Sequence, residues 1–304
     1  MTQPHAGAST HVTAGMLLPV VVLMLIWGSN WPVLKIGVAE IAPLTFRAFT
    51  LPFAGMGMLL VAHLSGDSIR IPRALWGKFI VLTIFNITLW NGLVIFGVQQ
   101  VPAGRSAILA YTMPVWGVLI SLVLLREPLT PRKILGLVFG MTAMALLLGE
   151  SIAHLERAPV GLLLLLGASF TWAIGTVLLR KWQIPLPPNT LVGWMILLGC
   201  MPLVLAAPFF ATGPWEWPSG PTLFAILYNI FLAGTVAHWA WFRLARTLPV
   251  VVSSISALSV PIVGVFAGML VLGEQPGITE FVALGLVVSA IAAVLWPPKT
   301  APDD

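Results

Sequence analysis

The fold is decided by the stretch TLWNGLVIFGVQQVPAGRSAILAYTMPVWGVLISLVLLRE, residues 88–127, because a second version of it, TVAHWAWFRLARTLPVVVSSISALSVPIVGVFAGMLVLGE, fills residues 235–274. At one constant shift of 147 positions the two versions share prolines, serines and a final glutamate: Pro102 and Pro249, Ser106 and Ser253, Pro114 and Pro261, and Glu127 and Glu274. Two leucine-rich strings can align by chance, but matched Pro, Ser and Glu at a single shift are harder to obtain than matched Leu. The stretch therefore predicts an internal repeat.

The composition is that of an all-α integral membrane protein. Of the 304 residues, 59% are hydrophobic and 8% are charged, whereas soluble domains carry roughly 25% charged residues. A helix that crosses about 30 Å of hydrocarbon needs roughly 20 apolar residues. Proline, glycine and charged residues divide the chain into apolar segments that predict ten membrane-spanning helices, at about 16–37, 43–64, 75–99, 103–125, 132–149, 160–180, 189–210, 221–244, 249–272 and 279–296.

The basic residues predict the orientation of these spans. If the N-terminus is cytoplasmic, eleven of the 15 Lys and Arg residues lie in cytoplasmic loops, one lies within a span, and only Lys35, Arg105 and Arg157 lie outside. Cytoplasmic loops carry the excess of Lys and Arg, so both termini are expected in the cytoplasm, as tails at 1–15 and 297–304. The first tail contains no Lys or Arg, so we expect the first apolar run to be retained as a helix.

The two halves, 16–149 and 160–296, are predicted to be inverted relative to each other. The shift of 147 positions carries each span onto the span five later, and Trp27 matches Trp172 at a shift of 145. Because five is odd, the second copy crosses the bilayer in the opposite sense, and a pseudo-twofold axis in the membrane plane relates the copies. Inverted repeats are typical of secondary transporters, whose substrate site lies near the midplane where the halves meet.

Polar side chains at helical spacing mark the expected substrate path. Such groups are costly in hydrocarbon unless they face protein or water, and Thr88 and Asn91 of the third span share one face of a helix. Their repeat partners are Thr235 and His238. Asn91 can donate and accept hydrogen bonds, as the carboxylate and ammonium of an amino acid require, and neutral His238 can do so too. The alternative is that each side chain bonds only a neighbouring helix.

Other residues are candidates for the same lining. Ser106 and Ser253 lie on stripes of small residues, which also allow close helix packing. Tyr111 lies deep in the fourth span, where lining the path and filling the core are equally consistent with the sequence. Mid-span tryptophans are placed to stack on an aromatic or aliphatic substrate, with core filling as the alternative for each: Trp27, Trp90, Trp172 and Trp239.

Prolines within the spans predict bends. In LMLIWGSNWPVLK, which begins at residue 23, Pro32 lacks an amide hydrogen and clashes with the carbonyl four residues earlier. Asn30 and the serine before it can satisfy the freed backbone groups. A bend would let the two halves of a helix tilt separately, as a gate must. Pro114 and Pro261 are further candidates for such bends, and static kinks are the alternative.

The charged residues bear on energy coupling. All ten carboxylates lie at span ends, in loops or in tails, so no mid-membrane Asp or Glu is available to carry protons. Uncoupled export down a solute gradient is the simpler expectation, with His238 as the one midspan candidate for proton linkage. Arg47, early in the second span, is placed to attract a carboxylate, although an arginine that snorkels to the interface is equally consistent with its position.

Other classes of function have little support in the sequence. HExxH and GxSxG motifs and clusters of Cys or His are missing, so we expect no catalytic residues, no metal and no cofactor. The net charge of +5 reports orientation and not nucleic-acid binding. A channel would favour a continuous polar lining. A channel-like pore and a membrane-embedded enzyme acting on a small amphipathic substrate are the alternatives to a transporter.

The pattern resembles the drug/metabolite transporter (DMT) superfamily, specifically its ten-span EamA type, across essentially the whole chain. The likeness is carried by Trp27-Gly28-Ser29-Asn30, by Phe46-Arg47, and by the run Pro102, Pro114, Glu127-Pro128 with its copy Pro249, Pro261, Glu274. The second copy departs from the first in having Val192 where the first has Arg47.

This resemblance implies movement of small metabolites, commonly export of amino acids, with the third, fourth, eighth and ninth spans lining a central cavity. Within the superfamily the chain is most similar to the bacterial aromatic amino-acid exporters (YddG-like). We therefore expect a multi-pass protein of the bacterial inner membrane that exports amino acids, including aromatic ones, by alternating access. Its expected partners are the small solute and the lipid bilayer, and a monomer is consistent with the sequence.

Overall fold

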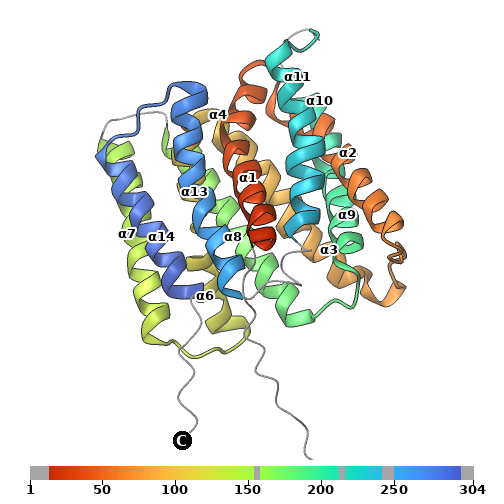
Figure 1. Cartoon of the computed structure of the whole chain (residues 1–304), viewed down its shortest axis with the longest axis horizontal. Coiled ribbons are helices and arrows are strands. Elements are labelled where there is room, and N and C mark those ends of the chain that lie inside the picture. Colours follow the sequence, from red (N-terminus) through yellow and green to blue (C-terminus); the bar gives the residue numbers. More distant parts are fainter. Residues whose placement is uncertain (1–13, 154–157, 212–215, 242–249, 296–304) are drawn as a thin grey trace, which may run out of the picture.

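The computed structural model describes residues 14–153, 158–211, 216–241 and 250–295, and within these ranges it contains helices and loops but no β-strand (Figure 1). Its elements are α1 (Ala14–Glu40), α2 (Pro43–Leu64), η1 (Arg73–Leu75), α3 (Trp76–Thr83), η2 (Ile84–Leu89), α4 (Trp90–Gln100), α5 (Ala103–Ala110), α6 (Met113–Leu124), α7 (Pro131–Ala153), α8 (Ala158–Trp182), α9 (Pro188–Gly199), α10 (Met201–Phe210), α11 (Gly220–Leu227), η3 (Tyr228–Val236), α13 (Val250–Leu272) and α14 (Ile278–Leu295). In Figure 1 α1 begins and α14 ends toward the lower side of the bundle. The predicted all-α fold is confirmed for the described residues.

Most of these helices group into membrane-crossing segments. In the described part of the chain, eight segments are long and apolar enough to cross a bilayer: Val20–Glu40, Pro43–Leu64, Arg73–Gln100, Ala103–Leu124, Pro131–Glu150, Val160–Trp182, Pro188–Phe210 and Gly220–Trp241. Two further apolar helices, Ser259–Leu272 and Ile278–Val294, are shorter within the described ranges. A helix satisfies its backbone hydrogen bonds internally, as hydrocarbon requires. The chain is therefore a multi-pass membrane protein.

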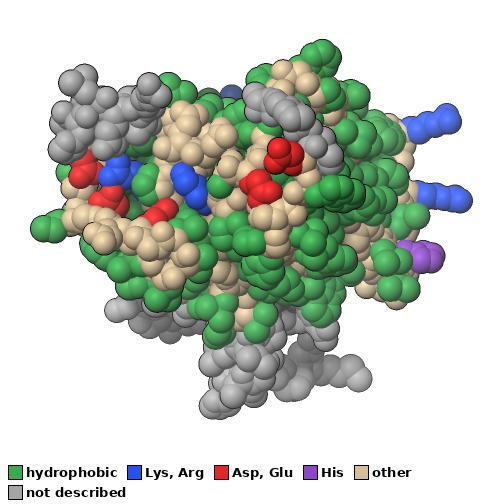
Figure 2. Space-filling model, turned by 90° about the horizontal axis from the view of Figure 1, so that it is seen from above, with side chains coloured by type: hydrophobic (Ala, Val, Ile, Leu, Met, Phe, Trp, Pro, Cys, Tyr) green, Lys and Arg blue, Asp and Glu red, His purple; other side chains and the backbone are tan. Residues whose placement is uncertain are grey.

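Large apolar side chains cover the outside of the bundle. The exposed residues of α2 include Phe49, Phe53, Met56 and Leu60, which follow one helical stripe. Hydrophobic side chains also dominate the flanks of the molecule in Figure 2. Soluble monomers rarely expose contiguous apolar patches larger than a few hundred Å². This stripe of α2 therefore faces lipid, and its opposite stripe faces protein.

Small residues set the closest helix contacts. α1 packs against α13, α8 against α5 and α6, α2 against α9, and α7 against α14. Gly28 allows the first contact, because a methyl group there would lie 2.3 Å from Cγ1 of Val263. A methyl group on Gly264 of α13 would lie 2.6 Å from Cβ of Ala107. Gly28, in the polar interruption of the first span, is thus a packing residue.

Replacing Gly28 with alanine is expected to destabilise this interface. Overpacking a tight interior contact typically costs about 1–3 kcal/mol, and the carbonyl oxygen of Val260 is also only 3.2 Å from the added methyl position. The purified variant should have a lower melting temperature than the wild type. Gly117→Ala is the control, because a methyl group there meets nothing within 4 Å. Equal losses in the two variants would contradict the packing role.

The helical segment Ala103–Leu124 is interrupted, whereas α13, which carries the same motif, is continuous. The break between α5 and α6 falls just before Pro114, whose missing amide hydrogen interrupts the helical ladder. α13 continues through Pro261, and α1 continues through Pro32. Proline at matching positions of the two segments therefore gives a helix break in one case and a continuous helix in the other, according to the packing around it.

The third and eighth spans each contain a π-helical segment, η2 and η3. Such segments are rare and are frequently found at functional sites. The shift of 147 positions carries residues 84–89 of η2 onto 231–236, inside η3. We did not predict them from the sequence, because a π turn has no local signature comparable with that of proline.

α6 and α13 end in the same type of cap. Arg126 and Gly273 each have a positive φ, of 54° and 68°. The next residue is Glu127 in one case and Glu274 in the other, and its amide donates to a carbonyl six residues earlier, at 3.3 Å in both. A residue with positive φ just after the last turn is a common helix C-cap, and the bond from the next amide reaches one residue further back than in a Schellman motif. Both glutamates are therefore held at a helix end, at matching positions of the repeat.

Candidate functional site

Two aromatic pairs lie in the interior of the bundle. The indole of Trp27 on α1 lies edge-on to the imidazole of His238, with ring centroids 5.4 Å apart. The indole of Trp90 on α4 lies 4.9 Å from that of Trp172 on α8. Trp27 also donates from Nε1 to the carbonyl oxygen of Ala233 at 3.3 Å. Each pair brings a residue of the first half against a residue of the second.

The polar residues predicted on the third and eighth spans bond carbonyls at the π-helical segments. Each side chain bonds a carbonyl oxygen of its own span at 2.9 Å. Asn91 bonds Ile87, Thr235 bonds Ile230, and His238 bonds Ala233. Since a carbonyl can only accept, Nδ1 of a neutral His238 carries the hydrogen and Nε2 is an acceptor. These bonds fix the side chains of Asn91 and His238, and His238 is itself one member of an aromatic pair.

Two threonines of these spans point toward peripheral helices. Thr88 donates to the carbonyl oxygen of Gly199, at the end of α9, at 2.8 Å. The side chain of Thr235 lies against Gly57 of α2, where a methyl group would come within 2.6 Å of its hydroxyl. α2 and α9 are the second predicted spans of the two halves, so the two threonines have equivalent neighbours.

The other predicted lining residues have different settings. Ser106 is fully buried and donates to the carbonyl just before α5, at 2.9 Å. Tyr111 is half-buried at the break between α5 and α6, and Trp239 is exposed. The amide oxygen of Asn30 is buried without a hydrogen-bond partner in the described part of the chain. The side chain of Ser253 lies outside the described residues.

The polar interruption of the first span is bonded from the eighth span. The hydroxyl of Tyr228 donates to the carbonyl oxygen of Ile26 at 2.7 Å and lies 2.9 Å from the hydroxyl of Ser29. Ser29 in turn donates to the carbonyl oxygen of Leu25 at 2.5 Å. We did not single out Tyr228 from the sequence, although tyrosines number only two in the chain. These bonds satisfy α1 carbonyls in the turns before Pro32.

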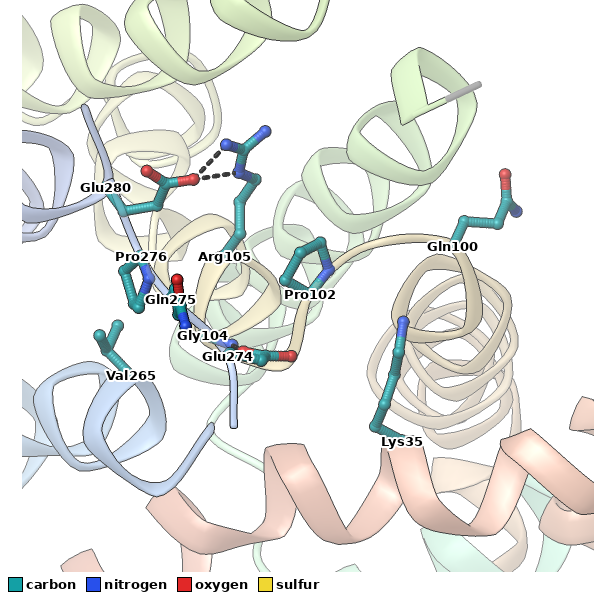
Figure 3. Close-up of a pocket in the computed structure, with 10 residues that line it drawn as sticks. All are labelled: Lys35, Gln100, Pro102, Gly104, Arg105, Val265, Glu274, Gln275, Pro276 and Glu280. Carbon is teal, nitrogen blue, oxygen red and sulfur yellow. Dashed lines mark hydrogen bonds and ion pairs between the residues drawn. The ribbon is translucent and has the colours of Figure 1, made fainter. Parts of the chain in front are cut away.

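Charged side chains gather at one end of the bundle (Figure 2). They line a cavity of about 390 Å³, drawn in Figure 3. Nζ of Lys35 donates to three carbonyls at the C-terminal end of α4, at 2.8 to 3.1 Å. A cation at that end of a helix complements the helix dipole. Lys35 therefore joins α1 to α4.

Glu274 holds the start of α5 in the same region. Its carboxylate accepts hydrogen bonds from the amides of Ala103 and Gly104, at 2.6 and 2.9 Å. An anion at a helix N-terminus is favoured by the dipole and by the free amides. The chain after α13 is thereby fixed to α5. The sequence contained no local signal of this contact, because the partners lie about 170 positions apart.

Arg105 completes this end of the molecule. Its Nη2 lies 2.8 Å from Glu150 at the end of α7, and its Nε donates to Glu280 of α14 at 2.9 Å. We call the five residues Lys35, Arg105, Glu150, Glu274 and Glu280 the charged cap. The cap joins α1, α4, α5, α7 and α14 with the end of α13.

Glu127 makes a second cluster of charges, at the far end of the fourth span. Its carboxylate lies 2.9 Å from Nζ of Lys133 and 2.6 Å from Nη1 of Arg180. The hydrogen bond from Lys133, with Arg180 beside it, holds the pKa of Glu127 below its ordinary range. In the sequence repeat, Glu127 matches Glu274 and Arg180 matches Lys35.

The Glu127 cluster should make stability depend on pH in acid. A carboxyl whose pKa is lowered in the folded state stabilises the fold above its unfolded pKa, and this contribution is lost as the pH falls through the lowered value. We expect Glu127→Gln to lower the melting temperature by the same small amount between about pH 6 and pH 8, and by nothing well below about pH 4. Exposed Glu216→Gln is the control. A deficit that is the same at every pH would contradict the assignment.

Comparison with known families identifies the chain. The model of the EamA-like transporter family matches residues 14–149 and again 159–296. The chain belongs to the EamA-like transporter family. The family's name and those of its relatives indicate transporters and not enzymes. Within the described residues of this EamA-like protein, no group of three or more potential metal ligands occurs.

Relatives of the EamA-like chain match it over most of their length. The "Uncharacterized transporter YoaV" of Bacillus subtilis is 26% identical over 90% of this chain and 93% of its own length. The "Uncharacterized inner membrane transporter YedA" of Escherichia coli K12 is 27% identical, covering 91% of each chain. The "Probable amino-acid metabolite efflux pump" of Salmonella typhimurium is 23% identical over 83% of this chain and 85% of its own.

A solved crystal structure has the same fold. It superposes with a TM-score of 0.64 at 20% identity and covers 93% of this chain and 98% of its own. This EamA-like protein therefore shares its helical arrangement with an experimentally determined structure.

Proposed function

We propose that this EamA-like protein is a secondary transporter that exports small metabolites across the bacterial inner membrane. Its best substrates are amino acids, including aromatic ones, as in the YddG-like exporters. The name of the E. coli relative supports the location, and the name of the Salmonella relative supports the substrate class. The substrate path runs between the two aromatic pairs, where indole faces suit an aromatic or aliphatic side chain and Asn91 and His238 supply polar groups.

The proposed architecture is ten spans in two inverted repeats, with both termini in the cytoplasm. Three correspondences at the repeat shift support it: the family model matches each half, η2 falls within η3, and the cap at Arg126 matches the cap at Gly273. Helix packing agrees, because the contact of α1 with α13 corresponds to that of α8 with α5 and α6. Exchange of the two halves preserves these contacts, as a pseudo-twofold axis requires.

The observation that carries the mechanism is the difference between the two matched spans. One is broken before Pro114, and the other is continuous through Pro261. Two copies of one motif thus adopt two conformations in a single molecule. If the halves exchange these conformations, the path opens at one end and then at the other. In this state the charged cap closes the outer end.

Counterflow in proteoliposomes tests the proposed function. Vesicles loaded with unlabelled phenylalanine, threonine or methionine should accumulate the labelled amino acid transiently and saturably. Non-saturable flux would indicate a channel, and a covalent change in the solute would indicate an enzyme. No flux across a broad amino-acid panel, in protein shown to be folded, would rule out this substrate class.

The flux should not depend on a proton gradient. The sequence contains no mid-membrane carboxylate, so uncoupled movement down the solute gradient needs no proton carrier. We expect initial counterflow rates with and without a protonophore to agree within about twofold. Abolition of counterflow by the protonophore would refute uncoupled transport and would assign proton linkage to His238.

A further inference from the structure

We propose that Arg47 is the anion-binding residue of the transport path and recognises the carboxylate of the solute. This inference deepens the proposed function and rests on it. The side chain of Arg47 is only 5% exposed, in the first turns of α2. Its Nε is buried without a hydrogen-bond partner, and no carboxylate in the described residues pairs with the guanidinium.

Among the described residues, two other cations near the start of α2, Lys35 and Arg105, are engaged. Lys35 donates to three carbonyls, and Arg105 is held by Glu150 and Glu280. Burying a charge without a partner is strongly unfavourable, so proteins rarely keep an arginine in that condition for packing alone. A guanidinium offers donors in a fork that matches a carboxylate bidentately. Arg47 therefore has the chemistry and the free donor capacity of an anion site.

The position of Arg47 directs it into the protein. It lies on the opposite side of α2 from the lipid-facing stripe of Phe49, Phe53, Met56 and Leu60. Ala54, seven residues later, shares the face of Arg47. A methyl group on Gly234 of η3 would lie 2.5 Å from Cβ of Ala54. Arg47 is thus on the side of α2 that packs against η3, one of the two π-helical segments.

Two features narrow the ligand to a monoanion. Within the described ranges, the cations of the charged cap already have partners, which leaves the positive charge of Arg47, whereas a phosphate dianion would favour several charges. The carboxylate of Glu40, the last residue of α1, is bound by Ser219 and Thr222. The matching position of the second half holds Val192, so the charge occurs once in an otherwise duplicated scaffold. A path with an arginine in the first half and a valine at the matching position of the second half suits a solute that carries a carboxylate at one end only.

The first test measures melting temperatures of the purified full-length protein. Removing an unpartnered buried charge should raise the melting temperature, so solute-free Arg47→Gln should melt above the wild type; a structural arginine would give a lower value. Phenylacetate should raise the melting temperature of the wild type and of Arg47→Lys, but not that of Arg47→Gln. Arg73→Gln, on the exposed surface, is the control for loss of a charge. A lower melting temperature in Arg47→Gln, or an equal phenylacetate shift in it, would overturn the proposal.

The second test compares counterflow of phenylalanine with that of phenylalaninamide. We expect the wild type to prefer phenylalanine at least tenfold in kcat/KM, and Arg47→Gln to raise the KM for phenylalanine at least tenfold and to lose this preference. Arg47→Lys should retain part of it. An unchanged preference in a folded Arg47→Gln would refute the role of Arg47 and leave the proposed function standing. Absence of any wild-type amino-acid flux would instead refute the proposed function, and phenylacetate binding would still test Arg47.

Discussion

Replacing Glu274 with glutamine is expected to open the charged cap and expose the start of α5. In the wild type, the Glu274 carboxylate accepts hydrogen bonds from two backbone amides, at Ala103 and Gly104. A hydrogen bond to a charged group contributes about 1.5–3 kcal/mol, and a glutamine side chain has only one oxygen to accept with. Since about 1.4 kcal/mol is a factor of ten, the ratio of closed to open cap should fall at least about tenfold.

A reporter cysteine can measure this opening. Ser106 is fully buried one turn inside the capped end of α5, and Ser106→Cys is nearly isosteric. In a Cys200→Ala background, which removes the single native thiol, a membrane-impermeant maleimide added outside should label this cysteine about tenfold faster when Glu274→Gln is present. Gln275→Ala, the exposed neighbour, is the control. An unchanged labelling rate in folded Glu274→Gln would show that the carboxylate does not hold the outer end closed.

Alanine at Asn91 or His238 is expected to lower amino-acid flux at least about fivefold without loss of expression. Both side chains are fixed by bonds to carbonyls of their own spans, and His238 also lies against Trp27. Loss of a hydrogen bond that leaves a buried polar group unsatisfied costs about 1–3 kcal/mol, which corresponds to a fall of about five- to 150-fold in rate. The measurement is the initial rate of phenylalanine counterflow.

The matched control separates lining from local helix bonding. Ser289 of α14 also donates to a carbonyl of its own helix, at 2.7 Å, but it lies on the exposed surface. Ser289→Ala should retain the wild-type rate. If Asn91→Ala and His238→Ala also transport at the wild-type rate, their role is confined to stabilising the π-helical segments.

The positions of the helices could be predicted because the bilayer imposes simple local rules. The predicted span at 43–64 is the helix Pro43–Leu64, since apolar length and flanking proline decide its ends. Local rules could not predict whether a given proline breaks its helix. Pro114 lies at a helix break, whereas α13 absorbs Pro261. The two positions match in sequence and differ only in their surroundings.

The candidate site could be predicted only in part. Trp27 and Trp172 were singled out as a matched pair of indoles, and each has an aromatic partner from the other half of the chain. The contacts of Glu274 with α5 and of Tyr228 with α1 join residues about 170 to 200 positions apart, so no local pattern reports them. The unpartnered state of Arg47 is likewise a property of packing.

The central claim is that matching sites in the two halves are exposed in turn. Ser106 and its repeat partner Ser253 provide matched reporters, as Ser106→Cys labelled from outside and Ser253→Cys labelled from inside, each in the Cys200→Ala background. The decisive measurement is the effect of Glu274→Gln on both labelling rates. Alternating access predicts that the outside rate rises and the inside rate falls. A rise in both rates together, as in an open pore, would contradict alternating access.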